Sequence, residues 1–295
     1  MHPKLPPAEY TWETIRSKEF LSTARKIITA SVPVGMNIVS VQHVRSSHYA
    51  AYRVSTEDGS WLVRIGLIAP EDSAAVDNSG FLGTSTTIPS GQKREKIVAE
   101  GYREFGGQVV APSHYIDVDG LDILWIPLIK DNGIDIDAEG WAQALNSLTY
   151  FIPEESEAAV FTNRTKSMNR LERLPKEMAL TLKREYDEKL SRFFDVSTRW
   201  SLVHGDAHAL NAMNTGDGVI LFDFDTVCWA PSVWDATHLI NRAGKEKHAS
   251  YSVDTLTTLL EVTPREVSAA LELRRVAARI SVEYSARGTQ HPFVS

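Results

Sequence analysis

The chain has 295 residues, of which 43% are hydrophobic and 23% are charged, and its net charge is −7. This length suits one large domain or two lobes of roughly 100–150 residues each, and the negative charge disfavours nucleic acid as the main partner. The single cysteine, Cys228, excludes an internal disulfide and a cysteine-based zinc site, and no apolar run reaches the roughly 20 residues that a membrane-spanning helix needs.

The first 130 residues hold most of the predicted strands. Residues 12–28 predict a helix, and residues 66–92, rich in glycine, serine and threonine, predict a long surface loop. A second helix is predicted over residues 93–105. The predicted strands lie between these elements and cover residues 38–44, 50–55, 61–65, 115–118 and 122–126.

The second half of the chain is mainly helical in prediction. A long charged helical region over residues 170–194 is interrupted at Pro175. The other predicted helices cover residues 138–151, 232–242, 252–260 and 264–285. We therefore expect an α+β protein with two lobes, 1–130 and 131–295, and a hinge near residues 127–131.

Two short segments carry groups suited to phosphoryl transfer. Asp206 stands in the sequence His204-Gly205-Asp206, Asn211 follows five residues later, and an apolar run ends at Asp223 twelve residues after Asn211. Phosphoryl transfer needs a carboxylate that orients the attacking hydroxyl, and metal ions that neutralise the phosphate. Magnesium prefers oxygen ligands, usually one or two protein groups together with phosphate and water. This spacing predicts a base and two ligand groups.

This pattern, with Asp223-Phe224-Asp225 as its second part, resembles the aminoglycoside phosphotransferase and choline kinase superfamily. The resemblance implies a bilobal protein-kinase-like fold, with a small antiparallel β lobe and a larger helical lobe. It implies Asp206 as the catalytic base and Asn211 and Asp223 as magnesium ligands, while His204 shapes the loop and Asp225 assists the metal site. Asp235, in the segment 231–235, resembles a structural aspartate of the family that often caps a helix.

The same resemblance implies a nucleotide site in the N-terminal lobe. Arg64 stands on the strand where the family places a basic residue, most often lysine, over the nucleotide phosphates, and Glu95 would pair with it. Backbone N–H groups of residues 45–50, with a hydroxyl of Ser46 or Ser47, would contact phosphate. Pro127 lacks an N–H group, so Leu128 or Ile129 is the expected donor to the adenine.

We expect transfer of the γ-phosphoryl group of ATP or GTP, with Mg²⁺, to a hydroxyl of a small molecule. The first candidate acceptor is an antibiotic, in resistance or self-protection, and residues 152–198 would vary with it. The alternative is a metabolite kinase acting on an amino alcohol, a sugar or homoserine. The negative net charge suits a cationic acceptor only weakly, because many metabolic enzymes are mildly acidic.

Two interpretations from other classes stay open. One is a nucleotide-binding pseudokinase, which would need a broken catalytic set. The other is a metal-dependent hydrolase built on His204 and His208; it predicts loss of activity on replacing His208, whereas the kinase interpretation predicts tolerance there and loss at Asp206. We expect a cytoplasmic protein without membrane or nucleic-acid partners, and the oligomeric state is not fixed by the sequence.

Overall fold

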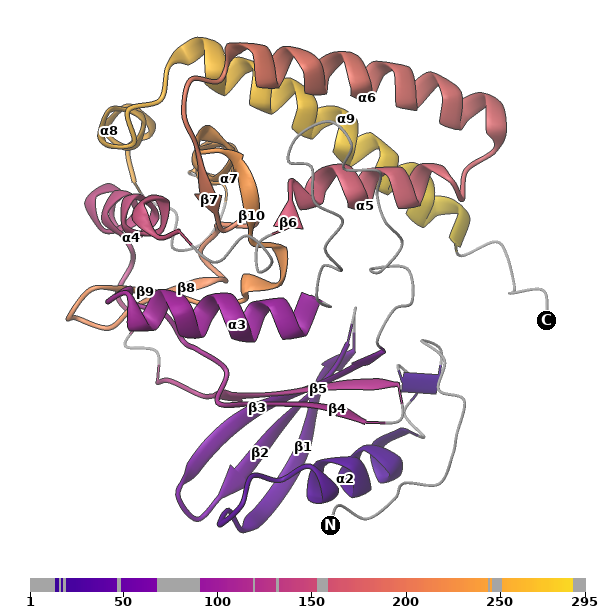
Figure 1. Ribbon diagram of the computed structural model, residues 1–295, viewed down its shortest axis with the longest axis vertical. Helices are drawn as coiled ribbons and strands as arrows, with labels where there is room; N and C mark the ends of the chain where they lie inside the picture. Colours follow the sequence, from indigo (N-terminus) through magenta and orange to yellow (C-terminus); the bar gives the residue numbers. More distant parts are fainter. Residues whose placement is uncertain are drawn as a thin grey trace. The chain divides into compact units, whose positions relative to one another are not determined.

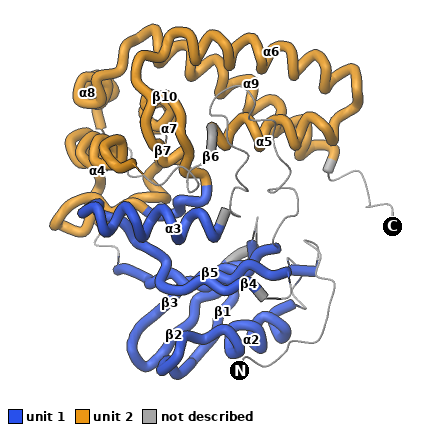
Figure 2. Tube along the Cα trace, viewed as in Figure 1, with its two compact units in different colours: residues 1–132, 153–157, 222–225 blue, residues 133–152, 158–221, 226–295 orange. Residues whose placement is uncertain are grey.

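The computed structural model describes residues 14–15, 17, 20–46, 49–67, 91–118, 120–130, 133–152, 159–243, 245 and 251–288. They form two compact units, coloured blue and orange in Figure 2. The first unit contains the described residues up to Asn132 together with Phe222–Asp225. The second contains Gly133–Ile152, the described residues up to Leu221, and those from Thr226 onward. The strand-rich first unit and the helical second unit are those of an α+β protein.

The first unit is built on a five-stranded antiparallel sheet in the order β1-β2-β3-β5-β4 (Figure 1). Residues Glu57 and Asp58 form the turn between β2 and β3, whose register pairs Thr56 with Gly59. Two helices accompany the sheet, α2 (Phe20–Ala30) and α3 (Gly91–Glu104). The strands are β1 (Ile38–Ser46), β2 (Ala50–Thr56), β3 (Gly59–Leu67), β4 (His114–Val118) and β5 (Leu121–Pro127).

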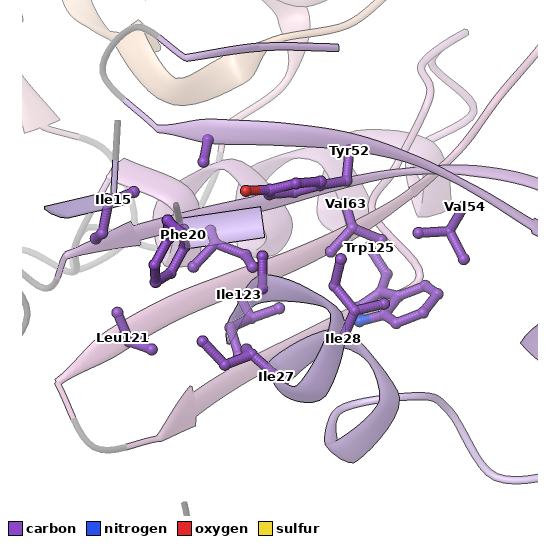
Figure 3. Close-up of a cluster of buried hydrophobic side chains, with 13 residues drawn as sticks. Ile15, Phe20, Ile27, Ile28, Tyr52, Val54, Val63, Leu121, Ile123 and Trp125 are labelled. Carbon is purple, nitrogen blue, oxygen red and sulfur yellow. The ribbon is translucent and has the colours of Figure 1, made fainter. Parts of the chain in front are cut away.

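Helix α2 and one face of the sheet form the core of this unit (Figure 3). Alternate residues of a strand point to opposite faces, so Val63 and Ile65 of β3 reach this core while Arg64 between them lies on the opposite face. Each large apolar side chain buried here contributes about 1.5–3 kcal/mol. The core residues of α2 and the sheet are Phe20, Ala24, Ile27, Ile28, Ala50, Tyr52, Val54, Val63, Ile65, Leu121, Ile123 and Trp125.

The second unit is mainly helical. Its two longest helices, α6 (Lys176–Val196) and α9 (Pro264–Gly288), pack along each other (Figure 1) and are joined by the ion pairs Arg192–Glu272 at 2.8 Å and Arg279–Glu185 at 2.7 Å. The other helices are α4 (Ala138–Tyr150), α5 (Thr162–Leu171), α7 (Val233–Arg242) and α8 (Val253–Leu259).

Short strands connect these helices. A three-stranded sheet has the order β6-β10-β7, and β8 pairs with β9 in a separate hairpin. A 3₁₀ turn, η2 (Phe224–Thr226), comes directly before β10. The strands are β6 (Ala159–Val160), β7 (Trp200–Val203), β8 (Ala212–Asn214), β9 (Val219–Leu221) and β10 (Cys228–Pro231).

The structure changes several predicted boundaries. The helical region expected over 170–194 is two helices, because α5 ends at Leu171 and α6 begins after Pro175, and α5 starts earlier than expected, at Thr162. The two-residue strand β6 and the strand β10 were not predicted. Residues 68–90 of the expected loop lie outside the described residues. In the part of the chain that is described, no helix is long and apolar enough to cross a membrane.

Candidate active site

The loop that carries Asp206 follows the buried end of β7 and is fixed at Gly205. The φ angle of Gly205 is +85°, in the left-handed region. A Cβ atom at this position would lie 2.3 Å from the backbone oxygen of Thr226. The hydroxyl of Thr226 also donates to the backbone oxygen of His204 at 3.0 Å. Only glycine fits here, so β7 can deliver Asp206 into a defined position.

Asp235 ties the same loop to helix α7. Its Oδ2 accepts the N–H of His204 at 2.7 Å, and its Oδ1 accepts the N–H of Gly205 at 2.9 Å. Burial raises the pKa of this carboxyl, against the opposing effect of these two hydrogen bonds. The sequence predicted a structural aspartate of a kind that often caps a helix. The structural role is confirmed, but both oxygens bind the loop backbone, and α7 has no side-chain cap.

Two imidazoles face the carboxylate of Asp206. His208 Nε2 lies 3.4 Å from Oδ2, and His238 Nδ1 of α7 lies 3.6 Å from Oδ1. The N–H of Leu210 donates to His208 Nδ1 at 3.1 Å, which places the proton of a neutral ring on Nε2, facing Asp206. Burial raises the pKa of Asp206, but the His208 hydrogen bond and the nearby histidines outweigh it and lower the pKa below its usual value.

Arg274 of α9 fixes the protonation of His238. Its Nη1 lies 2.6 Å from His238 Nε2, and a guanidinium can only donate, so Nε2 accepts and Nδ1 carries the proton toward Asp206. The backbone oxygen of Gly205, 2.8 Å from the same Nε2, takes its hydrogen bond from Trp234 Nε1 instead. Burial, with Arg274 adding to it, lowers the pKa of His238, which agrees with a neutral ring.

Asn211 folds back on the loop through its amide nitrogen. Nδ2 donates to the backbone oxygen of Asp206 at 3.0 Å and lies 3.5 Å from its Oδ2. This orientation leaves the amide oxygen of Asn211 as the atom that can bind a hard cation such as Mg²⁺.

His204 is fully buried, and its Nδ1 accepts the N–H of Asp206 at 3.4 Å, so it lies within the loop rather than on its surface.

The first unit holds a buried charge cluster around Arg64. Its Nη1 lies 2.7 Å from Glu95 Oε2 of α3 and 2.9 Å from Asp223 Oδ1, and the ring of Tyr49 lies 4.6 Å from the guanidinium carbon. Burial alone would lower the pKa of Arg64, but Glu95 and Asp223 outweigh it and raise the pKa, so the guanidinium stays charged. The pairing of Arg64 with Glu95 is the one expected from the sequence.

Asp223 has a backbone conformation that few residues adopt. Its φ angle is +68°, which aspartate tolerates better than most non-glycine residues. Oδ1 is buried and takes no hydrogen bond from the described residues, although the charge of Arg64 is near. A buried carboxylate oxygen that has an ion-pair partner but no aligned hydrogen-bond donor can also bind a metal cation. The backbone oxygen of Asp225 accepts from Arg94 of α3, so this segment is held by its main chain as well.

The predicted nucleotide contacts are only partly described. The N–H of Leu128 donates to the backbone oxygen of Ser60 at 2.9 Å, so Leu128 is wrong as the adenine donor, and Ile129 is the candidate that stays. Ser46 ends β1, but its side chain lies outside the described residues, as does Ser47 entirely. Their phosphate contacts therefore stay predictions.

His238 and Arg274 were missed by sequence reasoning. His238 stands three residues after Asp235, on the same side of α7, and this spacing was the available signal. Arg274 lies on α9, 36 residues further on, and has no local sequence signal. For the alternative hydrolase, no group of three or more His, Cys, Asp or Glu side chains within the described ranges is arranged to hold a metal ion.

Comparisons with known proteins show which family and which fold the chain is similar to. Residues 142–270 match the model of the phosphotransferase enzyme family, APH. No curated protein sequence matches the chain.

Three solved structures illustrate the likeness. The amicoumacin kinase hAmiN has 14% identity and a TM-score of 0.62, over 92% of this chain and 87% of that one. Choline kinase LicA from Streptococcus pneumoniae has 14% identity and a TM-score of 0.62, over 94% of each chain. An aminoglycoside-3′-phosphotransferase of type VIII has 13% identity and a TM-score of 0.60, over 88% of this chain and 100% of that one. The predicted kinase-like fold is confirmed. The match of residues 142–270 to the family model agrees with the predicted superfamily and with a small-molecule phosphotransferase.

Proposed function

Because its residues 142–270 match the phosphotransferase enzyme family, we propose that this protein transfers the γ-phosphoryl group of ATP or GTP to a hydroxyl of a small molecule. The observation that carries the proposal is the setting of Asp206, whose two carboxylate oxygens face the N–H groups of two imidazoles. Such a carboxylate is held in one orientation, ready to accept a hydrogen bond from an acceptor hydroxyl.

Asp206 acts mainly by orienting the acceptor in this proposal. A carboxylate with a lowered pKa is a weak base, so it takes the hydroxyl proton late, as bond formation to the phosphoryl group proceeds. The loop does not reorganise during the reaction, because Asp235 and Gly205 fix its backbone. A rigid loop with a weak base suits phosphoryl transfer, because positioning of the acceptor and the phosphoryl group supplies much of the catalysis in such enzymes.

Asn211 and Asp223 are the proposed ligands of Mg²⁺. The amide oxygen of Asn211 and the buried Oδ1 of Asp223 are hard oxygen donors of the kind that magnesium takes. When bound, the ion supplies neutralisation of phosphate charge. Support for a nucleotide comes from two relatives: hAmiN was solved with AMP-PNP and Ca²⁺, and a spectinomycin phosphotransferase with ADP and spectinomycin. Asp225 is proposed to assist the metal site indirectly, because its backbone oxygen accepts a hydrogen bond from Arg94 and so helps to hold the segment that carries Asp223.

Residues 1–130 are proposed as the nucleotide-binding lobe and residues 131–295 as the catalytic lobe. Arg64 would grip the nucleotide phosphates, positioned by Glu95 and covered by the ring of Tyr49. Ser46, Ser47 and the N–H of Ile129 would complete the nucleotide contacts. We propose a cytoplasmic enzyme.

The acceptor is proposed to be an antibiotic or a hydroxylated metabolite. Relatives with this fold are kinases of both kinds, among them a macrolide 2′-phosphotransferase and a choline kinase.

Thermal unfolding with and without Mg-AMP-PNP tests the proposed function. A ligand at about 100 times its dissociation constant stabilises the folded state by about 2.7 kcal/mol. We expect a clear rise in melting temperature with Mg-AMP-PNP and a much smaller rise for Asp223→Asn. The matched control, Asp217→Asn, changes an exposed aspartate in the β8–β9 turn and should respond like the wild type. Absence of any shift with Mg-ATP or Mg-GTP analogues contradicts the proposal.

A further inference from the structure

A cavity of about 300 Å³ lies in the second unit between α7 and α9. This volume is at the lower end of the range for small-molecule sites. Three cationic side chains and one amide line it together with apolar groups, and no carboxylate lines it within the described residues. The lining residues are Ile240, Asn241, Lys245, Leu271, Arg274 and Arg275, with Ala278.

Among the described residues, the cavity's Lys245 and Arg275 form no ion pair with a carboxylate. Lys245 Nζ donates to the backbone oxygen of Asn241 at 2.7 Å, which is a neutral partner. Arg275 is exposed, and within the described ranges no ion pair joins it, Lys245 or Arg274 to a carboxylate. Three cations that share a small cavity repel one another, and an anion placed there would remove this cost.

Arg274 is held rigidly at the wall of the cavity. Its Nε donates to Thr237 Oγ1 at 2.6 Å and its Nη2 to the backbone oxygen of Trp234 at 2.6 Å, and the guanidinium lies 3.7 Å over the Trp234 ring. These contacts and the one to His238 Nε2 use three of its five N–H groups, so two stay available. Burial lowers the pKa of Arg274 to about 9, and Arg242 adds to this effect, whereas the carboxylates of Asp235 and Asp206 oppose it.

Arg274 lines the cavity and also contacts a histidine that faces the proposed base. Arg274 Nη1 contacts His238 Nε2 at 2.6 Å, and His238 Nδ1 lies 3.6 Å from Asp206 Oδ1. We propose that the acceptor of this enzyme carries an oxyanion, a carboxylate or a phosphate ester, and that the cavity binds this group while the acceptor hydroxyl faces Asp206. This inference rests on the proposed function, because Asp206 has to be the group that orients the acceptor.

The apolar residues of the cavity indicate the chemistry of the part of the ligand next to the anionic group. Ile240, Leu271 and Ala278 offer apolar surface beside the cations, which suits a short aliphatic segment attached to the anionic group. Cationic aminoglycosides and amino alcohols would place positive charge against positive charge. The acceptor class is therefore a hydroxy acid or a phosphorylated hydroxy compound, and the net charge of −7 for the whole chain is a poor guide to the charge of this cavity.

Binding of charge-matched probes to the full chain tests the inference. The first set of probes shares a four-carbon skeleton and differs in the charge of one end: 4-hydroxybutyrate, 4-hydroxybutyramide and 4-aminobutan-1-ol. A second comparison, glycerol 3-phosphate with glycerol, tests whether the anionic group can be a phosphate ester. Calorimetric titration is done with saturating Mg-AMP-PNP, so that the nucleotide site is occupied and the measured heat does not come from anions binding there. Lys245→Gln/Arg275→Gln is the test variant because both side chains are exposed, and Arg279→Gln, also on α9, is the matched control.

We expect 4-hydroxybutyrate or glycerol 3-phosphate to bind, and the uncharged and cationic partners to bind at least about tenfold more weakly, as the loss of a charged hydrogen bond implies. The double variant should lose a similar factor for the anion, whereas Arg279→Gln should bind like the wild type. Stronger binding of the amine, no binding of either anion, or an unchanged affinity in the double variant overturns the inference. If the anion binds but Mg-AMP-PNP does not, the proposed function fails and the cavity stands as an anion site alone.

Discussion

Replacing Asp235 by asparagine tests how the loop that carries Asp206 is held. The carboxylate accepts two backbone N–H groups, from His204 at 2.7 Å and Gly205 at 2.9 Å, and it is buried. Asparagine keeps one acceptor oxygen and places an NH₂ group against the other N–H. The loss of one charged hydrogen bond costs about 1.5–3 kcal/mol, and the unpaired buried donor adds about 1–3 kcal/mol.

The expected destabilisation of Asp235→Asn is therefore about 3–6 kcal/mol, which corresponds to a fall in melting temperature of roughly 6–24 °C for a domain of this size. Because the loop shifts, kcat should fall about a hundredfold. Calorimetry and steady-state kinetics measure the two effects. Asp254→Asn, an exposed aspartate on α8, should change stability by less than about 0.5 kcal/mol. An Asp235→Asn protein that melts within about 2 °C of the wild type would refute the reasoning, because a shift this small corresponds to a loss of less than about 1 kcal/mol in the free energy of unfolding.

Two further substitutions probe the loop and the first unit. Gly205→Ala should abolish stable folding of the second unit, because the added Cβ lies 2.3 Å from a backbone oxygen. Gly216 has a φ angle of +89° and open space around it, so Gly216→Ala should lower the free energy of unfolding by only about 1–2 kcal/mol, as measured by chemical denaturation. Glu95→Gln removes one partner of a buried ion pair and should cost about 3–5 kcal/mol and weaken ATP binding. Glu100→Gln, in a partly exposed pair on the same helix, should cost less than about 1 kcal/mol, and equal effects at both positions would contradict the expectation.

Some of the site was predictable because its chemistry is encoded locally. Asp206 and Asn211 are five residues apart in one loop, so their spacing alone indicates that they act together. Arg64 stands between two apolar residues of a strand, so alternation predicts that it leaves the core face, and the structure places it beside Glu95. In both cases a periodicity of a few residues fixes where the side chain goes.

Other features depend on contacts that the sequence does not encode locally. Arg274 reaches His238 from another helix, and no spacing rule connects two residues 36 positions apart. The N–H of Leu128 is used by Ser60 because β5 continues one residue further against β3 than expected. The partners of Asp235 were not predicted for the same reason, since they lie 31 and 30 residues earlier in the chain.

The most direct test of the central claim is phosphoryl transfer from radiolabelled ATP, with Mg²⁺, to a panel of antibiotics, amino alcohols and hydroxylated anions. Wild type is compared with Asp206→Asn and with His208→Gln, which changes a histidine that faces Asp206 and is not itself proposed to touch the acceptor. We expect a labelled product with wild type and a loss of at least about a thousandfold for Asp206→Asn. The sequence predicted tolerance at His208, but the structure places its Nε2 3.4 Å from Asp206 Oδ2, so we expect a loss of about tenfold for His208→Gln. Full activity of Asp206→Asn, or a greater loss for His208→Gln than for Asp206→Asn, would contradict the assignment of Asp206 as the catalytic base.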